Sequence, residues 1–271
     1  MVVQQHRRGG GALAASAAVV ATMVTGCSVP ADARPGAEPG DAVRAAPAAL
    51  THAGTAKART SMEMATGGTR VTIRGEGSYD FRARHGRLRV VLPKGTTGAS
   101  EHRPITELLV PGALYMKNRG AGVPADKWVR VDTATLTDGN LVTGGATDPA
   151  AAAELLRGVL EVAYVGEEEL AGEPVTHYRG TADLGRAARA ASPQVRGALA
   201  AAAKGFTRDT VPFDVYLDRE GRLRKVRHQF SFTNQGRTVA VASTTLLYEF
   251  GAAVHVELPP RRDIYAGRIR A

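Results

Sequence analysis

The sequence is poor in the residues that build covalent cross-links and metal sites. Its 271 residues include one cysteine, Cys27, and one tryptophan, and aromatic residues make up only 5% of the chain. A single thiol can form neither an intramolecular disulfide nor a zinc site of several thiolates. The fold must therefore be held together mainly by the burial of small and medium apolar side chains.

The common motifs of catalysis and cofactor binding are also missing. GxSxG, HExxH, SxxK and GxxxxGK do not occur in the chain. His228 is the one histidine in an apolar strand-like setting, and a hydrogen-bonded core histidine is favoured there over a catalytic base. The acidic run "GEEEL" at 166–170 is interpreted as a solvated strand end rather than a calcium site. We therefore expect no enzymatic activity, no metal and no cofactor.

No apolar run reaches the roughly 20 residues that a membrane-crossing helix requires. The most apolar stretch, "ALAASAAVVATMV", has about 13 residues and follows the basic segment "MVVQQHRRGGG". Residues 1–26 are therefore predicted to be a secretory signal peptide. The pair Arg7-Arg8 leaves a twin-arginine route open beside the general secretory route.

The only cysteine follows this signal directly. The segment Val24-Thr25-Gly26-Cys27 resembles the bacterial lipobox, in which two small residues precede a cysteine that receives a diacylglycerol before cleavage. A buried free cysteine is the alternative, but the neighbouring Gly, Ser and Pro argue against a core position. We expect a lipid-anchored protein on the extracytoplasmic face of the bacterial cell membrane, because two or more acyl chains anchor stably.

Composition divides the remaining chain into three parts. Residues 27–55 contain four prolines and almost no bulky apolar residue, which predicts a disordered tether. Residues 56–258 carry periodic hydrophobic signals and have a length that suits one domain. Residues 259–271, "PPRRDIYAGRIRA", are predicted to form a basic C-terminal tail.

The clearest folding signal is "TRVTIRGEGSYDFRA", residues 69–83. Apolar residues occupy one parity and charged or polar residues the other, which predicts a strand with one buried face. Two glycines on the buried parity indicate a bend or a close approach. Similar runs joined by short turns recur to about residue 256, and they predict antiparallel pairing in a large meander.

Two alanine-rich segments predict helices within this meander. In "TDPAAAAELLRG", Asp148 is placed as the N-cap with Pro149 at the first helical position. The segment "DLGRAARAASPQVRGALAAAAKG" predicts two short helices, the second beginning after Ser192 and ending at Gly205. The predicted class is α+β, with two or three short helices packed on a curved antiparallel sheet.

The formal net charge of +9 does not point to nucleic acid. Many arginines lie on the solvent parity of strands and are not interleaved with aromatic side chains, as a nucleic-acid surface would require. Because the chain is predicted to be exported, anionic lipid headgroups or wall polymers are the more accessible counter-charge.

Four segments carry a resemblance to a known family: "GALYMK…KWVRVD" (112–132), "EEELAGEPVTHYRGTADL" (167–184), "VPFDVYLDREGRLRKVRHQF" (211–230) and "TTLLYEFG" (244–251). Together with the signal and tether, they resemble the LppX/LprG-type lipoproteins of actinobacteria and, more distantly, the LolA and LolB lipoprotein carriers. The resemblance implies a U-shaped half-barrel of about eleven strands closed by helices. It also implies an apolar cavity that holds lipid or glycolipid.

The residues alone leave two alternatives open, because a packed core gives the same alternation as a ligand cavity. The cavity hypothesis predicts that the apolar parity faces a common space lined by Val71, Ile73, Tyr79, Phe81, Val90, Val110, Met116, Phe213, Val215, Phe230 and Phe232. The predicted function is binding or carrying of lipid by a membrane-anchored lipoprotein. The alternative is a regulatory or scaffolding envelope lipoprotein that holds an unidentified protein partner and has no ligand cavity.

Overall fold

A computed structural model of the chain describes residues 38–93, 103–120, 122–143, 146–234 and 236–267. These residues belong to one compact unit. The predicted signal peptide and Cys27 lie outside the described residues, so lipidation stays a prediction. No helix among the residues described is long and apolar enough to cross a membrane.

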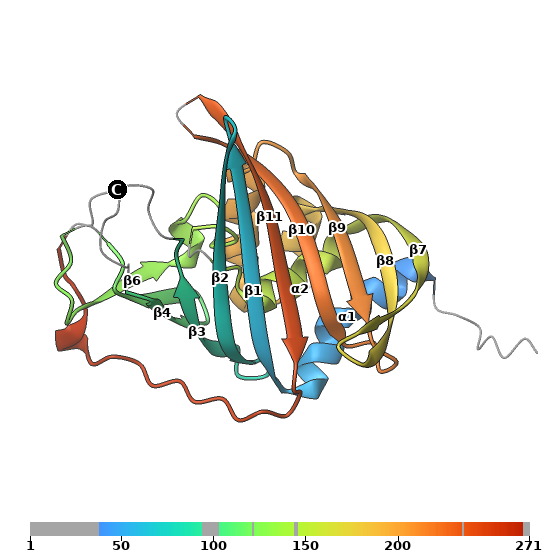
Figure 1. Ribbon diagram of the computed structural model, residues 1–271, viewed down its shortest axis with the longest axis horizontal. Coiled ribbons are helices and arrows are strands. Elements are labelled where there is room, and N and C mark those ends of the chain that lie inside the picture. The colour runs from blue at the N-terminus through green and yellow to red at the C-terminus, as the bar shows by residue number, and fades with distance from the viewer. Residues whose placement is uncertain (1–37, 94–102, 121, 144–145, 235, 268–271) are drawn as a thin grey trace, which may run out of the picture. The chain divides into compact units, whose positions relative to one another are not determined.

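Within the described residues, a single open antiparallel sheet organises the fold (Figure 1). Its eleven strands lie in the order β6-β5-β4-β3-β2-β1-β11-β10-β9-β8-β7. The strands are β1 (Thr55–Thr66), β2 (Thr69–Asp80), β3 (His85–Val91), β4 (Ile105–Val110), β5 (Ala113–Lys117), β6 (Trp128–Asp132), β7 (Val159–Leu170), β8 (Glu173–Asp183), β9 (Thr210–Leu217), β10 (Leu223–Asn234) and β11 (Arg237–Tyr248). The predicted fold class, a curved and unclosed antiparallel sheet with helices, is confirmed.

The glycines of β2 show why a side chain is excluded at the middle of this sheet. A Cβ on Gly77 would lie 1.8 Å from the carbonyl oxygen of Arg87 in β3, and a Cβ on Gly75 would lie 2.5 Å from Oγ1 of Thr60. Both contacts are far inside van der Waals distance, so only glycine lets the neighbouring groups come this close. The predicted close approach at these glycines is confirmed.

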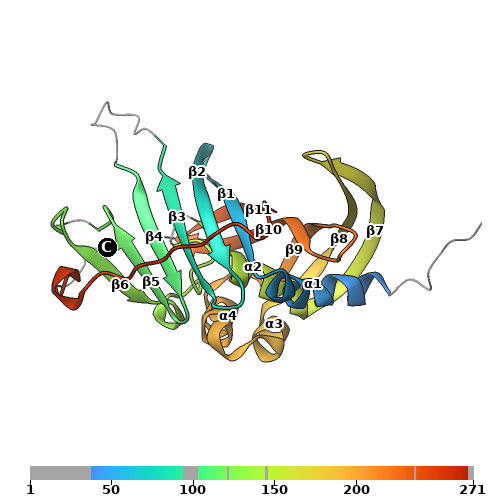
Figure 2. The ribbon, with the colours of Figure 1, turned by 90° about the horizontal axis from the view of Figure 1, so that it is seen from below.

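The described residues also form four α-helices, and Figure 2 shows α3 and α4 below the middle of the sheet and α1 running toward its β7 end. They are α1 (Pro39–Ala53), α2 (Pro149–Glu154), α3 (Leu184–Ala190) and α4 (Pro193–Gly205). The carboxylate of Asp148 caps α2 as predicted, because it accepts hydrogen bonds from the backbone N–H groups of Ala150 and Ala151. Three of the helices, α2 to α4, correspond to the two alanine-rich segments.

Helix α1 corrects the predicted tether. From Pro39 onward the segment expected to be disordered is a helix of 15 residues, and Val43, Ala46 and Leu50 are fully buried along one of its faces. The spacing of these residues is that of an amphipathic helix. The prolines of this segment favoured the prediction of a disordered tether over that of a helix. In the structure, Pro39 occupies a favourable first-turn position and Pro47 is accommodated inside the helix.

The C-terminal segment is also more ordered than a basic tail. After β11 it passes the lower strand ends and reaches β6 in Figure 1. There Ile264 forms a parallel bridge with Trp128, and the backbone N–H of Tyr265 donates to the Trp128 carbonyl at 2.8 Å. The folded domain therefore extends beyond residue 258, and this segment covers the β6 edge of the sheet.

Candidate functional site

The residues predicted to line a cavity gather in one place. Eight of them are buried members of a single apolar cluster between the sheet and the helices: Ile73, Tyr79, Phe81, Val90, Met116, Phe213, Val215 and Phe230. Val71 and Phe232 are half-buried and pack against this cluster. Val110 is half-buried and lines the cavity described next. The sheet thus brings together residues from strands that are distant in the sequence.

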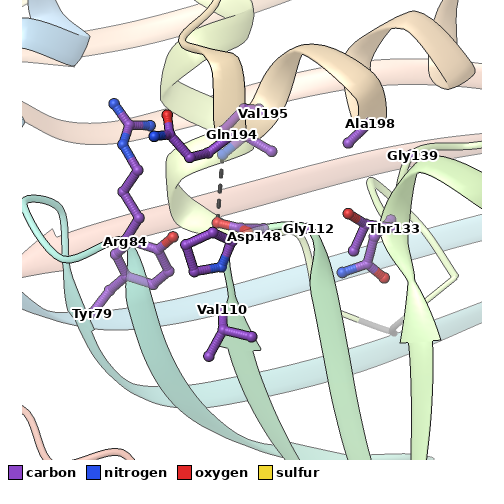
Figure 3. Close-up of a pocket in the computed structure, with 13 residues that line it drawn as sticks. Tyr79, Arg84, Val110, Gly112, Thr133, Gly139, Asp148, Gln194, Val195 and Ala198 are labelled. Atoms are coloured by element: carbon purple, nitrogen blue, oxygen red, sulfur yellow. Dashed lines mark hydrogen bonds between the residues drawn. The ribbon is translucent and has the colours of Figure 1, made fainter.

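A small cavity lies where this apolar cluster meets the helices (Figure 3). Tyr79 and Val110 contribute from the sheet, while Val195 and Ala198 contribute from α4. Its volume is about 20 Å³, which is close to the space that one water molecule needs. In this conformation the cavity has no room for an acyl chain. We call the contact between the sheet and helices α2 and α4, including this cavity, the seam.

Three ionisable side chains line the cavity: Tyr79, Arg84 and Asp148. Burial raises the pKa of the Asp148 carboxyl, even though the N–H groups of Ala150 and Ala151 donate to it. Burial, followed by the neighbouring Asp148 charge, raises the pKa of the Tyr79 phenol well above its ordinary value. Both effects disfavour charge on Tyr79 and Asp148, so the part of the cavity beside these two side chains suits an uncharged polar group.

A polar cluster holds the helices against the β2–β3 turn. Nη1 of Arg84 donates to Oγ of Ser192 at 2.7 Å and lies 3.5 Å from the buried Glu154 carboxylate. The same carboxylate accepts from Nε of Arg157 at 2.6 Å and from the backbone N–H of Ser192 at 3.2 Å. Arg84 has a φ of 55°, an unfavourable value for a residue with a side chain. We call Arg84, Glu154, Arg157 and Ser192 the latch, because they join α2, the α3–α4 junction and the sheet.

Two glycine contacts hold α4 close to the loop that follows β6. A Cβ on Gly139, whose φ is 59°, would lie 2.0 Å from the carbonyl oxygen of Ala198. A Cβ on Gly205 would lie 1.8 Å from the carbonyl oxygen of Thr137. Side chains at these positions would push α4 away, so the closed seam depends on both glycines.

Four buried polar side chains on the sheet have atoms without a hydrogen-bond partner among the described residues: Thr60, Glu107, Arg224 and His228. Burial raises the pKa of Glu107 to about 8, although the charge of Arg119 opposes this. Burial alone lowers the pKa of His228 to about 3, so this histidine is neutral at physiological pH. It is a core residue as predicted, but its Nε2 atom lacks the expected hydrogen bond.

The described part of the chain contains no cluster of three or more His, Cys, Asp or Glu side chains that could hold a metal ion. His177 has two carboxylate partners, with Glu168 at 2.7 Å from Nδ1 and Asp214 at 2.9 Å from Nε2. Its ring also stacks on Tyr216 with 4.2 Å between the ring centroids. These contacts join β7, β8 and β9, and each ring nitrogen of His177 has a carboxylate partner.

Comparison with known proteins finds no matching family model and no matching curated protein. Several solved structures are similar. LprF from Mycobacterium bovis is 12% identical over 82% of this chain and 96% of its own, with a TM-score of 0.39. The lipoprotein LppX from Mycobacterium tuberculosis is 10% identical over 80% of this chain and 99% of its own, with a TM-score of 0.43.

A LolA-superfamily protein from Nitrosomonas europaea is 11% identical over 79% of this chain and 95% of its own, with a TM-score of 0.35. These similar structures come from the same groups that the strand-and-turn segments of the sequence resemble.

Sequence reasoning missed the latch and the packing of α1. Within the latch, Arg84 contacts residues 70 and 108 positions further along the chain, and no periodic pattern links a turn arginine to a helix junction. For α1 a signal was present, because Val43, Ala46 and Leu50 follow helical spacing. Its prolines outweighed that spacing in the prediction.

Proposed function

We propose that this chain is an exported bacterial lipoprotein, anchored through an acylated Cys27, whose folded domain binds an amphiphilic lipid at the seam. The acyl chains would enter between the sheet and helices α2 and α4, and an uncharged polar part of the lipid would lie near Tyr79 and Asp148. The observation that carries the proposal is the continuous apolar seam, with a partly polar cavity at its margin.

The many alanines at the seam would make it easier for helices α2 and α4 to move away from the sheet. All four alanines of α2 are buried, and α4 contributes Ala198 and Ala202 beside its larger Val195 and Leu199. Each alanine buries little apolar area, and the free energy of burial scales with area. Moving these helices off the sheet therefore costs less than separating two layers of large side chains. An acyl chain that takes their place would restore much of the buried apolar surface.

The latch would control this opening. Arg84 is the only latch residue on the β2–β3 turn, and its hydrogen bond and ion pair cross to the helix side. Charge-assisted hydrogen bonds of this kind contribute roughly 1.5 to 3 kcal/mol when partly buried. Breaking the contacts of Arg84 would therefore raise the population of the open seam.

Native mass spectrometry of the protein purified from bacterial membranes tests the proposal directly. The mature protein should carry a co-purifying lipid that solvent extraction removes, and the Cys27→Ser variant should lose the covalent diacylglycerol but keep the bound lipid. Lipid-free protein that takes up no lipid from membranes would contradict the binding proposal. A Cys27→Ser protein that remains acylated would contradict the anchor proposal.

Uptake kinetics test the role of the latch. Arg84→Ala should accelerate uptake of a fluorescent fatty acid about tenfold, because the contacts holding the seam closed are lost. Arg186→Ala is the matched control, since Arg186 is exposed on α3 and its side chain takes no part in the latch. Equal uptake rates for the two variants would remove the latch from the mechanism.

A second function, binding of a protein partner, is favoured by strand β7. This strand is an end of the sheet, and it carries three exposed large apolar residues: Leu160, Tyr164 and Val165. Exposed edge strands can pair with an extended segment of another protein. If the seam never binds lipid, a scaffold that presents β7 to a partner explains the domain better. Tyr164→Lys would then abolish partner capture and leave the lipid content unchanged.

A further inference from the structure

The sheet has a second face, opposite the helices, and three arginines gather in one groove on it. Arg59 on β1, Arg74 on β2 and Arg89 on β3 all point to this outer face and are exposed. They line a groove of about 610 Å³. We call these three residues the arginine triad.

The strand register places the triad within one small patch. Arg59 pairs with Glu76, and Glu76 pairs with Arg89, so these three lie in one row across β1, β2 and β3. Arg74 lies in the adjacent row, between Ser61 and Val91. Cross-strand neighbours are about 5 Å apart at Cβ, so the three guanidinium groups share one site.

The triad lacks compensating partners. None of its guanidinium groups forms an ion pair or hydrogen bond with another described residue, and Arg59 only lies over the ring of Tyr248 at 5.3 Å. Other arginines of the described chain do form ion pairs, such as Arg179 with Asp214 at 2.8 Å and Arg222 with Asp218 at 2.8 Å. With Glu76 as the one acid in the groove, the patch has an uncompensated positive charge.

An apolar rim completes the groove. Val91 is 41% exposed at the end of β3, and the half-buried Leu92 and the exposed Pro93 follow it in the groove wall. A guanidinium group can donate two parallel N–H···O hydrogen bonds to one phosphate. An exposed apolar rim beside it suits the glycerol and upper acyl region of a lipid. This pairing of charge and apolar surface favours an amphiphilic anion over a purely ionic one.

We propose that the arginine triad is a docking site for anionic phospholipid headgroups, which holds the outer face of the sheet against the membrane surface. This proposal rests on the proposed lipid anchor at Cys27, and the length of chain between that anchor and the folded domain supports it. About 12 residues separate Cys27 from the start of α1, and they span at most about 40 Å. The anchor would therefore keep the domain close to the membrane surface, where the triad meets a high density of phosphate groups.

Vesicle co-sedimentation tests the proposal. The probe is the chain from residue 27 to 271 carrying Cys27→Ser, so that no acyl chain contributes to binding. This protein should bind vesicles that contain phosphatidylglycerol and should not bind vesicles of pure phosphatidylcholine. The Arg59→Gln/Arg74→Gln/Arg89→Gln variant should bind about 100-fold more weakly, because each arginine near an anionic surface contributes roughly one factor of five.

The matched control is Arg186→Gln/Arg189→Gln/Arg196→Gln, which removes the same charge from exposed positions on α3 and α4. It should weaken binding less than about threefold, as expected for a long-range effect of net charge. Equal losses for the two variants would overturn the proposal, because binding would then follow net charge alone. The single variant Arg74→Glu gives the same comparison if the triple variant is unstable.

Competition with soluble glycerol phosphate separates a membrane surface from a free phosphate ligand. Sodium sulfate of equal ionic strength is the reference for charge screening. If glycerol phosphate displaces the protein from vesicles only at concentrations where sodium sulfate does so too, the result supports the docking site. Tight, saturable binding of glycerol phosphate would overturn it in favour of a soluble ligand. Because the assay measures no lipid at the seam, its outcome is independent of whether the seam binds lipid.

Discussion

At the scale of single residues, two buried ionisable groups oppose each other in their effect on stability. Glu107 keeps its proton to about pH 8 in the fold, while His228 stays neutral down to about pH 3. The folded state therefore binds more protons than the unfolded state at Glu107, between pH 4.5 and 8. It binds fewer at His228, between pH 3 and 6.5.

The pH dependence of Glu107→Gln is the prediction at this scale. In the wild-type protein, the raised pKa of Glu107 contributes to the free energy of unfolding. This contribution is fully present below about pH 4.5 and is lost as the pH rises toward 8. Glutamine does not titrate, so the Glu107→Gln variant should not lose this contribution. Its free energy of unfolding relative to the wild type should therefore rise by up to about 1.4 kcal/mol per pH unit. Denaturant melts between pH 5 and 9 would measure it. A difference that does not change with pH would show that Glu107 titrates normally.

At the scale of secondary-structure elements, α1 decides where the folded domain begins. The helix packs on β7 and on the turn after α2, and its buried residues join the main core cluster. Burial of Val43, Ala46 and Leu50 offsets the low helix propensity contributed by Pro47. The segment is therefore part of the fold, and a chain that begins at Thr55 would expose the apolar surface that α1 covers.

Leu50→Ala tests the packing of α1. Leu50 is fully buried, so its truncation should lower the free energy of unfolding by roughly 2 to 5 kcal/mol. Arg44→Ala on the exposed side of the same helix should change it by less than about 0.5 kcal/mol, because Arg44 pairs only with Asp41. Urea unfolding at fixed pH compares the two variants. A small effect of Leu50→Ala would restore the prediction of a disordered tether.

At the scale of the whole molecule, the two ends of the sheet are protected in different ways. The C-terminal segment covers β6 through the bridge of Ile264 with Trp128. Strand β7 is protected instead by the acidic run Glu167–Glu169 and by irregular pairing near Val159 and Tyr164. Like charges and irregular pairing oppose pairing of β7 with the same strand of a second copy of this chain.

Removal of the C-terminal segment is the prediction at this scale. A chain that ends at Gly251 loses the backbone bond from Tyr265 to Trp128 and exposes the β6 edge. This chain should self-associate in a concentration-dependent way, because the backbone N–H and C=O groups of an exposed edge strand can pair with another copy. Sedimentation velocity would detect the association, and a chain that ends at Gly267 is the control. A monomeric truncated chain would show that the segment does not protect the edge.

The amino-acid pattern alone determined the fold class, because alternation with a period of two depends only on which face of a strand is buried. It indicated the close approach at Gly75 and Gly77 and the start of α2 at Asp148 for similarly local reasons. Tertiary structure decided the rest. The latch at Arg84, the bridge at Ile264 and the closed state of the seam depend on contacts between distant segments, which no local pattern encodes. The same apolar parity fits a filled core and an open cavity, and only the packing of the helices on the sheet left about 20 Å³ at the seam.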